Sequence, residues 1–563
     1  MSEALPVWAH QLRERYLGGE ASVFVVHGNV RDLVPDGAGG LVDLPNWLAA
    51  FLGRSRDVVA AYDPSRGLHF PIDAAHGRRF LQAASARAAV RGEPGLTVAP
   101  RPLRDVLAAT EDVLTSPGMR AAFVLDHADL VLPRAEAAFL GEDERSNLVR
   151  LLRWTDAPLL RATDSLVVLV CDALPELHPR LRASPQLAVV PVPYPDVDAR
   201  HAFLAAHQLP GLTVSMSLER LAEVTAGLTL VQLRALLLGA IRSGEPLDFA
   251  AVNARKKEII ETECAGLVEL ITPSHTLADV GGLEGVKASL QRVADAIVAG
   301  ETRRVPMGIG FVGPMGTGKT FVAEAFAASS GLTCLALRNV RDRWVGSSEA
   351  NLEKVLGLVD ALGYALLILD EAERLLAPGG AEDATNSRLI ARLKTFLSDT
   401  RHRGRVVVLM MTNRPDKLEV DLKRPGRMDL KIPFFFPETD GERAAVLAAQ
   451  FRRAGVAIGF DLGPLAAATA GRSAAELEQV VVAALALSDD QGRDAPTAAD
   501  AMAAAADTLP SRDTRRLRFM ELLAVFEATS RGMLPPRYQT MSTDEVQDAL
   551  AQLATALGEP PPG

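Results

Sequence analysis

The chain has 563 residues, more than one hydrophobic core usually holds, so about three or four domains or subdomains are expected. Its formal net charge of −10 argues against broad, sequence-independent nucleic-acid binding, which needs clusters of Lys and Arg. The three cysteines are scattered, so neither a disulfide framework nor a zinc site is readable, and a cytoplasmic location is expected. No apolar stretch reaches the roughly 18–20 residues that span a bilayer, and the N-terminus lacks a signal-peptide pattern.

The first half of the sequence alternates short apolar runs with helical patterns, which is typical of a parallel α/β sheet. We expect residues 1–250 to form this sheet and, from about residue 196, a small helical segment. The expected strands are Val23–Val26, Val58–Ala61, Ala122–Leu125, Leu166–Val170 and Ala188–Val192.

Residues 251–275 are expected to connect this half to the second one. They contain a charged helical pattern at Asn253–Glu263 and an extended Thr-Pro-Ser-His stretch at 272–275. Both features suit a linker that holds no core of its own.

The second half repeats the alternation of strands and helices. We expect a sheet over residues 276–437, a helical segment over 438–506, and a C-terminal helical extension over 507–563 with a disordered Pro-rich end. The strands expected in this sheet are Ile309–Val312, Cys334–Ala336, Leu366–Leu369, Val406–Met410 and Lys431–Phe435.

Three features occur in both halves, in the same order and at nearly the same separation. An apolar run that ends in Asp126 matches one that ends in Asp370. The Pro-rich strand end before residue 195 matches the one before residue 437, and a Thr-Ala-Gly string at 225–227 matches 469–471. One such pair would mean little, but three at a near-constant offset favour two copies of one domain.

A single phosphate-binding pattern, G-x-x-x-x-G-K-[ST], occurs in the chain, and it lies in the second copy between an expected strand and an expected helix. Its glycines let the backbone wrap a phosphate chain, the lysine supplies a charge for the β- and γ-phosphates, and the final hydroxyl suits Mg²⁺. An ordinary Gly-rich turn is the alternative. The pattern consists of Gly313, Pro314, Met315, Gly316, Thr317, Gly318, Lys319 and Thr320.

Further parts of an ATPase site follow in the right order. Asp370 ends a buried strand, where its carboxylate can hold Mg²⁺, and Glu371 comes next and can polarise the attacking water. Asn413 ends the next strand and can orient the water or the γ-phosphate. The alternatives are an acidic strand end that faces solvent and a simple turn asparagine.

Arg424 and Arg427 flank a Pro-Gly turn. They can form an ordinary salt-bridged surface turn. The alternative is that they reach the γ-phosphate bound by a neighbouring subunit, as arginine fingers do, which would couple hydrolysis to assembly.

These motifs, with the string Leu277–Glu284, resemble the AAA proteins of the AAA+ superfamily over about residues 276–505. The whole chain resembles two-part bacterial and cyanobacterial-plastid AAA proteins whose first domain is degenerate. This resemblance implies an α/β fold of two tandem AAA-type P-loop domains, each with a parallel sheet between helices and a small helical lid. It also implies ATP and Mg²⁺ as cofactors, a homo-hexameric ring and a protein substrate.

The resemblance also implies roles for individual residues. Asp279 and Gly281, with Gly471 and Ala474, would line the adenine, and Asn413 would be the sensor asparagine. Trp344 and Val345 match the pore loop that grips an extended polypeptide, for which an exposed indole offers a large apolar surface. A core position for Trp344 is the alternative.

The first copy lacks the chemistry of the second. After Val23–Val26 comes a segment with one glycine and no lysine, and His127 stands where Glu371 would be. The position of Asn413 falls on Cys171 or Asp172, depending on a one-residue shift. We therefore expect a pseudo-ATPase domain that acts as a scaffold, substrate receptor or partner platform.

Two functions compete. The first is an ATP-driven remodeller that threads or disassembles a protein partner. The second is an ATP-controlled assembly or regulatory scaffold with slow turnover and no threading. A ring-borne metalloprotease is disfavoured because neither an H-E-x-x-H pattern nor a membrane segment occurs, and nucleic-acid translocation is disfavoured by the acidic balance.

Overall fold

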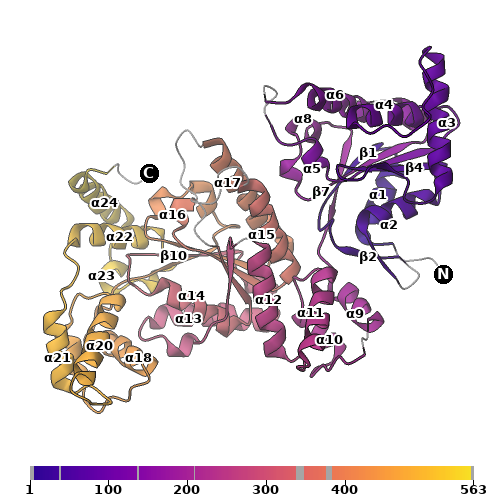
Figure 1. Cartoon of the computed structure of the whole chain (residues 1–563). Coiled ribbons are helices and arrows are strands. Elements are labelled where there is room, and N and C mark those ends of the chain that lie inside the picture. Colours follow the sequence, from indigo (N-terminus) through magenta and orange to yellow (C-terminus); the bar gives the residue numbers. More distant parts are fainter. Residues whose placement is uncertain are drawn as a thin grey trace. The chain divides into compact units, whose positions relative to one another are not determined.

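Two six-stranded sheets, one in each half of the chain, form the framework of the protein (Figure 1). The structure is a computed structural model and describes residues 5–36, 40–135, 139–156, 158–207, 210–264, 266–337, 348–375 and 383–559. The chain divides into two units, residues 1–259 with 349–361 and residues 260–348 with 362–563, and each is described by itself.

The first sheet has the strand order β5-β4-β6-β7-β1-β8. All neighbours are parallel except β5, which pairs antiparallel with β4. A small antiparallel pair, β2 (Leu33–Pro35) and β3 (Leu41–Asp43), stands apart from it. The strands of the sheet are β1 (Val23–Gly28), β4 (Val58–Asp63), β5 (Gly67–His69), β6 (Ala121–Leu125), β7 (Leu166–Cys171) and β8 (Leu187–Val192).

Helices cover both faces of the first sheet because successive strand residues point to opposite sides. Phe24 and Val26 pack with α1 and α2, whereas Val23 and Val25 face a core built with α3, α4 and α6. The helices of this layered part are α1 (Val7–Leu17), α2 (Leu44–Gly53), α3 (Ala74–Val90), α4 (Leu103–Leu114), α5 (Ala128–Val131), α6 (Glu142–Asp156), α7 (Pro158–Ala162) and α8 (Pro179–Arg182).

A small helical segment, the first lid, follows this sheet and has its own hydrophobic cluster around Phe203, Leu221, Leu233 and Leu237. It consists of α9 (Val197–Ala206), α10 (Leu218–Val224), α11 (Leu230–Ser243) and α12 (Phe249–Glu263).

The second sheet has the order β14-β10-β13-β12-β11-β9, and only its edge strand β9 is antiparallel to its neighbour. Residues 268–271, which the sequence placed in the linker, are this edge strand. The strands are β9 (Val268–Ile271), β10 (Gly308–Val312), β11 (Thr333–Leu337), β12 (Ala365–Leu369), β13 (Val406–Thr412) and β14 (Leu430–Pro433), so the last one ends two residues earlier than expected.

Helices also pack on the second sheet. Ile309 and Phe311 of β10 contact a core built with α13 and α14. The helices of this part are α13 (Glu284–Val298), α14 (Lys319–Ser330), α16 (Ala372–Leu375) and α17 (Asp383–Ser398). Helix α15 (Ser348–Leu362) belongs with residues 349–361 to the first unit. A second lid follows, made of α18 (Asp440–Arg453), α19 (Gly463–Ala468), α20 (Ala474–Asp489) and α21 (Ala498–Asp507).

The C-terminal extension folds back onto the second sheet. It contains α22 (Thr514–Glu527), the short 3-10 helix η7 (Arg531–Met533), α23 (Pro536–Gln539) and α24 (Thr543–Leu557). Val312 of β10 and Phe435 after β14 belong to one hydrophobic cluster with Phe519, Tyr538 and Leu550 of this extension. The extension therefore shares a core with the sheet.

The two halves repeat one fold. In both sheets the five parallel strands have the same spatial order, namely the second, third, fourth, first and fifth along the chain. Both lids also use a buried arginine in the same way. Arg200 donates from Nε to the carbonyl oxygen of Ala222 (2.9 Å), and Arg443 donates from Nε to that of Ala466 (2.7 Å). The predicted fold of two tandem copies, each with a lid, is confirmed.

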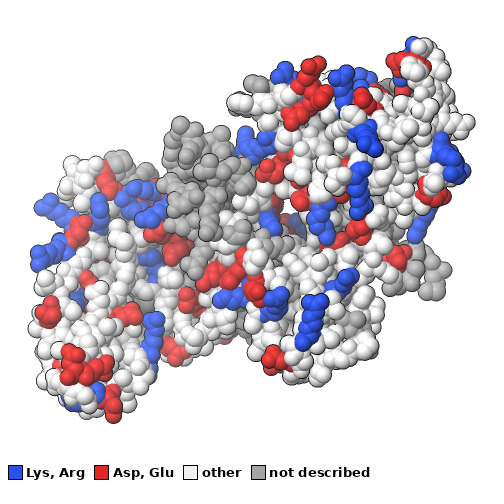
Figure 2. Space-filling model, in the orientation of Figure 1, with Lys and Arg blue, Asp and Glu red and all other residues white. Residues whose placement is uncertain are grey.

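The described surface carries charges of both signs. On the face shown in Figure 2, Lys and Arg side chains lie among Asp and Glu side chains, and no continuous field of one sign covers the described residues in view. None of the helices in the described part of the chain is long and apolar enough to cross a bilayer. The three cysteines are free and buried.

Candidate nucleotide site

The loop between β10 and α14 carries the phosphate-binding pattern in its expected setting. β10 ends at Val312 and α14 begins at Lys319, so the first N–H groups of the helix are available to the loop. Gly313 has a φ of 151°, and a Cβ atom there would lie 2.2 Å from the carbonyl oxygen of Phe434. Glycine is therefore required where the loop leaves the sheet.

The side chain of Lys319 reaches back over the loop. Its Nζ donates to the carbonyl oxygens of Gly313 (2.8 Å) and Pro314 (2.7 Å) and to Oδ1 of Asn413 (2.7 Å). Burial lowers the pKa of Lys319 to about 8, although the nearby carboxylates of Asp370 and Glu373 favour its charged form. A buried cation that is bound by uncharged oxygens is suited to receive the negative charge of phosphate.

Two carboxylates follow β12, the second strand over from β10. Because β10, β13 and β12 are parallel neighbours, their C-terminal ends meet at one edge of the sheet. Thr320 donates from Oγ1 to Oδ2 of Asp370 (3.4 Å). Glu371 has a positive φ of 47°, and its Oε2 lies 2.8 Å from Nη1 of Arg374. The structure thus brings Lys319, Thr320, Asp370, Glu371 and Asn413 together, as the sequence predicts for an ATPase site.

The donor set at this edge fits magnesium. Hydroxyl and carboxylate oxygens, here those of Thr320 and Asp370, are the ligands that Mg²⁺ prefers. Within the described ranges, no three His, Cys, Asp or Glu side chains form a group that could hold a metal ion by themselves. A magnesium ion here would therefore complete its coordination with water and with nucleotide phosphates.

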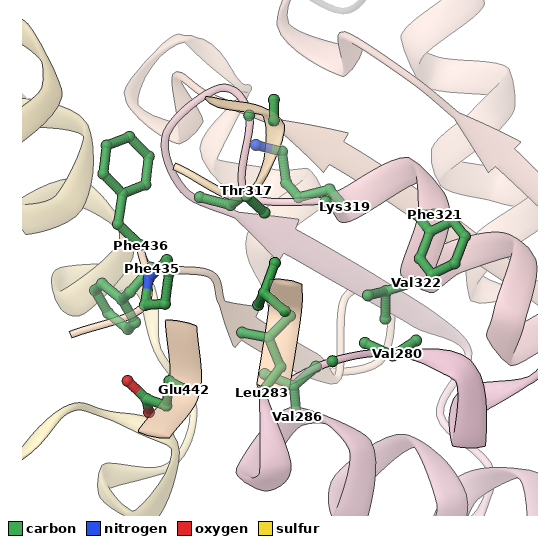
Figure 3. A pocket seen from close by; sticks show the side chains of 18 of the residues that line it. Val280, Leu283, Val286, Thr317, Lys319, Phe321, Val322, Phe435, Phe436 and Glu442 are labelled. Carbon is green, nitrogen blue, oxygen red and sulfur yellow. The ribbon is translucent and has the colours of Figure 1, made fainter. Parts of the chain in front are cut away.

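A cavity of about 650 Å³ extends from this edge (Figure 3). Figure 3 shows Thr317 and Lys319 at one end of it, Val280, Leu283 and Val286 at the other, and Phe435 and Phe436 along one side. The cavity therefore has a cationic, N–H-rich end and an apolar end, which suits a molecule with a phosphate chain and a flat ring.

Most of the residues predicted for this site line the cavity. They are Asp279, Gly281, Met315, Gly316, Thr317, Gly318, Lys319, Thr320, Asp370, Glu371, Asn413 and Ala474. Gly313 and Pro314 lie at the base of the loop and bind Lys319 through their carbonyl oxygens. Gly471 is not among the lining residues and forms the turn before α20, with a φ of 75°.

Segment 279–282 and the second lid bound the cavity together. The carboxylate of Asp279 accepts from the backbone N–H of Thr276 (2.8 Å), and this bond lowers the pKa of Asp279. Gly281 approaches α18 so closely that a Cβ atom would lie 2.4 Å from the carbonyl oxygen of Ala445. At the N-terminus of α20, Ala475 donates its N–H to the carbonyl oxygen of Gly316 (3.0 Å). The lid thus contacts the phosphate loop directly.

Arg424 and Arg427 lie apart from this cavity and line another one of about 420 Å³. The side chain of Arg424 is 69% exposed and pairs with Asp421 (3.1 Å). Arg427 is held more firmly, because it donates to Oγ of Ser398 (3.0 Å) and to the carbonyl oxygen of Asp421 (2.9 Å). Neither arginine lines the pocket that contains Lys319 of its own chain.

The sequence motifs do not include all of the residues that line the cavity. Phe435, Phe436 and the C-terminal segment 532–536 line it as well. The Phe run at 434–436 was visible as a strand end, but no pattern in Gly532–Pro536 distinguishes that segment from an ordinary turn. Its position depends on contacts with residues far away along the chain.

The first sheet has a counterpart of the site at the same edge, with different side chains. Gly28 matches Gly313, because it has a φ of 99° and a Cβ atom there would lie 2.8 Å from the carbonyl oxygen of Val192. His127 matches Glu371 and also has a positive φ, of 52°. The strand register aligns Asp172 with Asn413, which resolves the one-residue ambiguity in the sequence.

An arginine binds this counterpart edge. Arg31 donates from Nη1 to Asp126 (2.7 Å) and from Nε to Asp172 (2.7 Å), and its Nη2 lies 3.0 Å from Nδ1 of His127. In the first copy an arginine of the protein therefore binds the residues that match Asp370, Asn413 and Glu371 of the second. These contacts of Arg31 could not be predicted from the sequence because the residue belongs to no motif.

The predicted pore-loop residues Trp344 and Val345 lie outside the described residues.

Comparisons with known proteins agree with this geometry. The model of the AAA+ chaperone N-terminal Rossmann-like domain matches residues 2–193, and that of the AAA+ chaperone second helical domain matches residues 198–265. The model of the ATPase family associated with various cellular activities (AAA) matches residues 309–436.

Among curated proteins, the cell division cycle protein 48 homolog of Archaeoglobus fulgidus is 28% identical over 393 residues. The match covers 63% of this chain and 53% of that relative, so the chain spans about half the length of the relative. The family models in both halves, together with the phosphate loop and the strand-end residues beside it, show that the chain belongs to the AAA+ ATPases.

Proposed function

We propose that the second domain hydrolyses ATP with Mg²⁺ and that the protein uses this energy to remodel, thread or disassemble a protein partner. The observation that carries the first part is the meeting of Lys319, Thr320, Asp370, Glu371 and Asn413 at one end of the cavity. The AAA+ chaperone matches support the second part.

Each side chain has a definite task in this proposal. Lys319 and the N–H groups of the phosphate loop hold the β- and γ-phosphates. Glu371 takes a proton from the attacking water, and Asn413 orients that water or the γ-phosphate. Thr320 and Asp370 would hold Mg²⁺, which neutralises charge that develops on the phosphate oxygens. Arg424 and Arg427 complete the site from the next subunit of a homo-hexamer.

The first domain has a different task. Its Arg31 network uses the residues that match Asp370 and Asn413, so we propose that it hydrolyses no ATP and receives the partner. Residues 1–250, 276–437, 438–506 and 507–563 then act as receptor, ATPase core, lid and extension. Residues 251–275 connect the two halves, except that residues 268–271 belong to the second sheet as β9. The three free, buried cysteines of the whole chain support the proposal of a cytoplasmic location.

The catalytic proposal is tested by a matched pair of substitutions. Glu371→Gln should retain ATP binding and lower ATP turnover by about 10²–10⁴-fold, because it removes the general base. His127→Gln changes the matching position of the first domain and should leave turnover at the wild-type rate. Equal turnover of wild type and Glu371→Gln, measured as phosphate release, would overturn the proposal.

A test of the remodelling proposal first requires that the partner be identified. ATP-loaded Glu371→Gln should retain this partner in a pull-down, because its ring does not complete hydrolysis. Trp344→Ala should then keep ATP turnover and lose processing of that partner, since the indole supplies the grip. Partner processing that is unchanged in Trp344→Ala would instead favour an ATP-controlled scaffold without threading.

A further inference from the structure

The C-terminal extension reaches the nucleotide cavity. Gly532, Met533, Leu534, Pro535 and Pro536 all line it, more than 200 residues after the phosphate loop. They follow α22 and form η7 and the start of α23. The extension thus contributes a continuous stretch of chain to the cavity wall, although no phosphate-binding motif lies in it.

This stretch is held on both sides. Met533 packs against the hydrophobic core that contains Val280, Val286 and Leu290. Leu534, only 9% exposed, packs in the other cluster with Val312, the residue just before the phosphate loop. Gln539 donates from Nε2 to the carbonyl oxygen of Leu534 (2.8 Å). The segment is therefore fixed between two cores and does not depend on nucleotide for its position.

Other residues that line the cavity also contact the C-terminal extension. Phe435, which lines the cavity, stacks on Tyr538 at a ring-centroid distance of 5.6 Å. Glu438, also a lining residue, forms an ion pair with Arg537 (2.6 Å). Phe435 and Glu438, two residues that line the cavity, thus contact the extension directly.

The position of Met533 identifies the part of the nucleotide that it faces. Lys319 marks the phosphate end of the cavity, and Val280 and Val286 mark the apolar end. Met533 packs against the core that contains both valines, and a Cβ atom on Gly285, next to Val286, would lie 3.7 Å from the carbonyl oxygen of Gly532. A base has two flat apolar faces and gains most from apolar side chains that exclude water.

We propose that residues 532–536 form the outer wall of the base-binding end of the ATP pocket, with Met533 in contact with the base. The C-terminal extension is then part of the substrate site. This inference rests on the proposed ATPase function and adds to it a residue that sets nucleotide affinity.

The test compares two ligands of the full-length protein, Mg-ATP and Mg-tripolyphosphate, which has the phosphate chain but no base. Met533→Ala should weaken ATP binding by about tenfold, the effect of removing apolar contact in a pocket. It should leave tripolyphosphate binding unchanged. Met533→Leu, which keeps most of the apolar surface, should restore ATP binding. Dissociation constants are measured by titration calorimetry.

A matched control is Met541→Ala, which removes the same side chain from the extension at a place that does not line the cavity. Its affinity for ATP should equal that of the wild type. Unchanged ATP affinity in Met533→Ala would overturn the inference. Equal weakening for both ligands would overturn it as well, because the segment would then only support the phosphate loop. Failure of the wild type to bind either ligand would instead contradict the proposed function.

Discussion

At the scale of single residues, the surroundings of Lys319 determine its protonation and therefore how it binds a phosphate chain. Its ammonium group is bound by three uncharged oxygens, from Gly313, Pro314 and Asn413. These satisfy its hydrogen bonds but supply no negative charge, so burial weakens its hold on the proton. Phosphate oxygens would bring the missing charge and make the protonated form far more favourable.

The affinity for ATP should therefore depend on pH. Free Lys319 has a pKa of about 8, and a bound phosphate chain raises it. Below pH 8 the free lysine is already protonated, so affinity stays level. Above pH 8 binding must also take up a proton, so the dissociation constant of Mg-ATP should rise by up to about tenfold per pH unit. Titrations between pH 7 and 9.5 measure this.

Lys319→Arg provides the control for this prediction. A guanidinium group stays charged over the whole range, so its affinity, though lower, should not change with pH. A wild-type dissociation constant that stays level up to pH 9.5 would show that Lys319 keeps its proton without nucleotide.

At the scale of elements, the two lids contact their sheets differently. The N–H groups of Leu230 and Val231, at the start of α11, both donate to the carboxylate of Asp32 (3.0 Å each). Asp32 is 5% exposed, so this is a buried N-terminal cap. At the start of α20 the corresponding contact goes to the carbonyl oxygen of Gly316 in the phosphate loop. The first lid is held by a side chain, and the second contacts the loop that would bind phosphate.

Much of this architecture could be predicted from the sequence, because a buried parallel strand is an unbroken apolar run. All ten parallel strands were located in this way, and strand ends placed Asp370, Glu371 and Asn413 at one edge. The edge strands β5 and β9 were missed because they are short and only partly buried. Arg31 and Met533 were missed because their roles depend on long-range contacts.

At the scale of the whole molecule, two groups that the proposed reaction requires lie in separate places on the chain. Lys319 lines one cavity and Arg424 another. Two different surfaces of the same chain can meet only head to tail, and repetition of such a contact closes a ring when the rotation allows. Arg424 suits the contact better than Arg427, because its side chain is 69% exposed while Arg427 is held by Ser398 and Asp421.

Mixing two inactive variants tests this arrangement. Lys319→Ala removes the phosphate contact and keeps Arg424, whereas Arg424→Ala does the reverse, so each alone should turn over ATP poorly. In a ring assembled from equal amounts of both, one site in four would join an intact pocket to an intact arginine, and about a quarter of the wild-type phosphate release should return. A mixture of Lys319→Ala and Asp370→Asn should regain nothing, because both changes disable the same pocket. If the first mixture co-assembles and stays inactive, Arg424 does not act across the subunit contact.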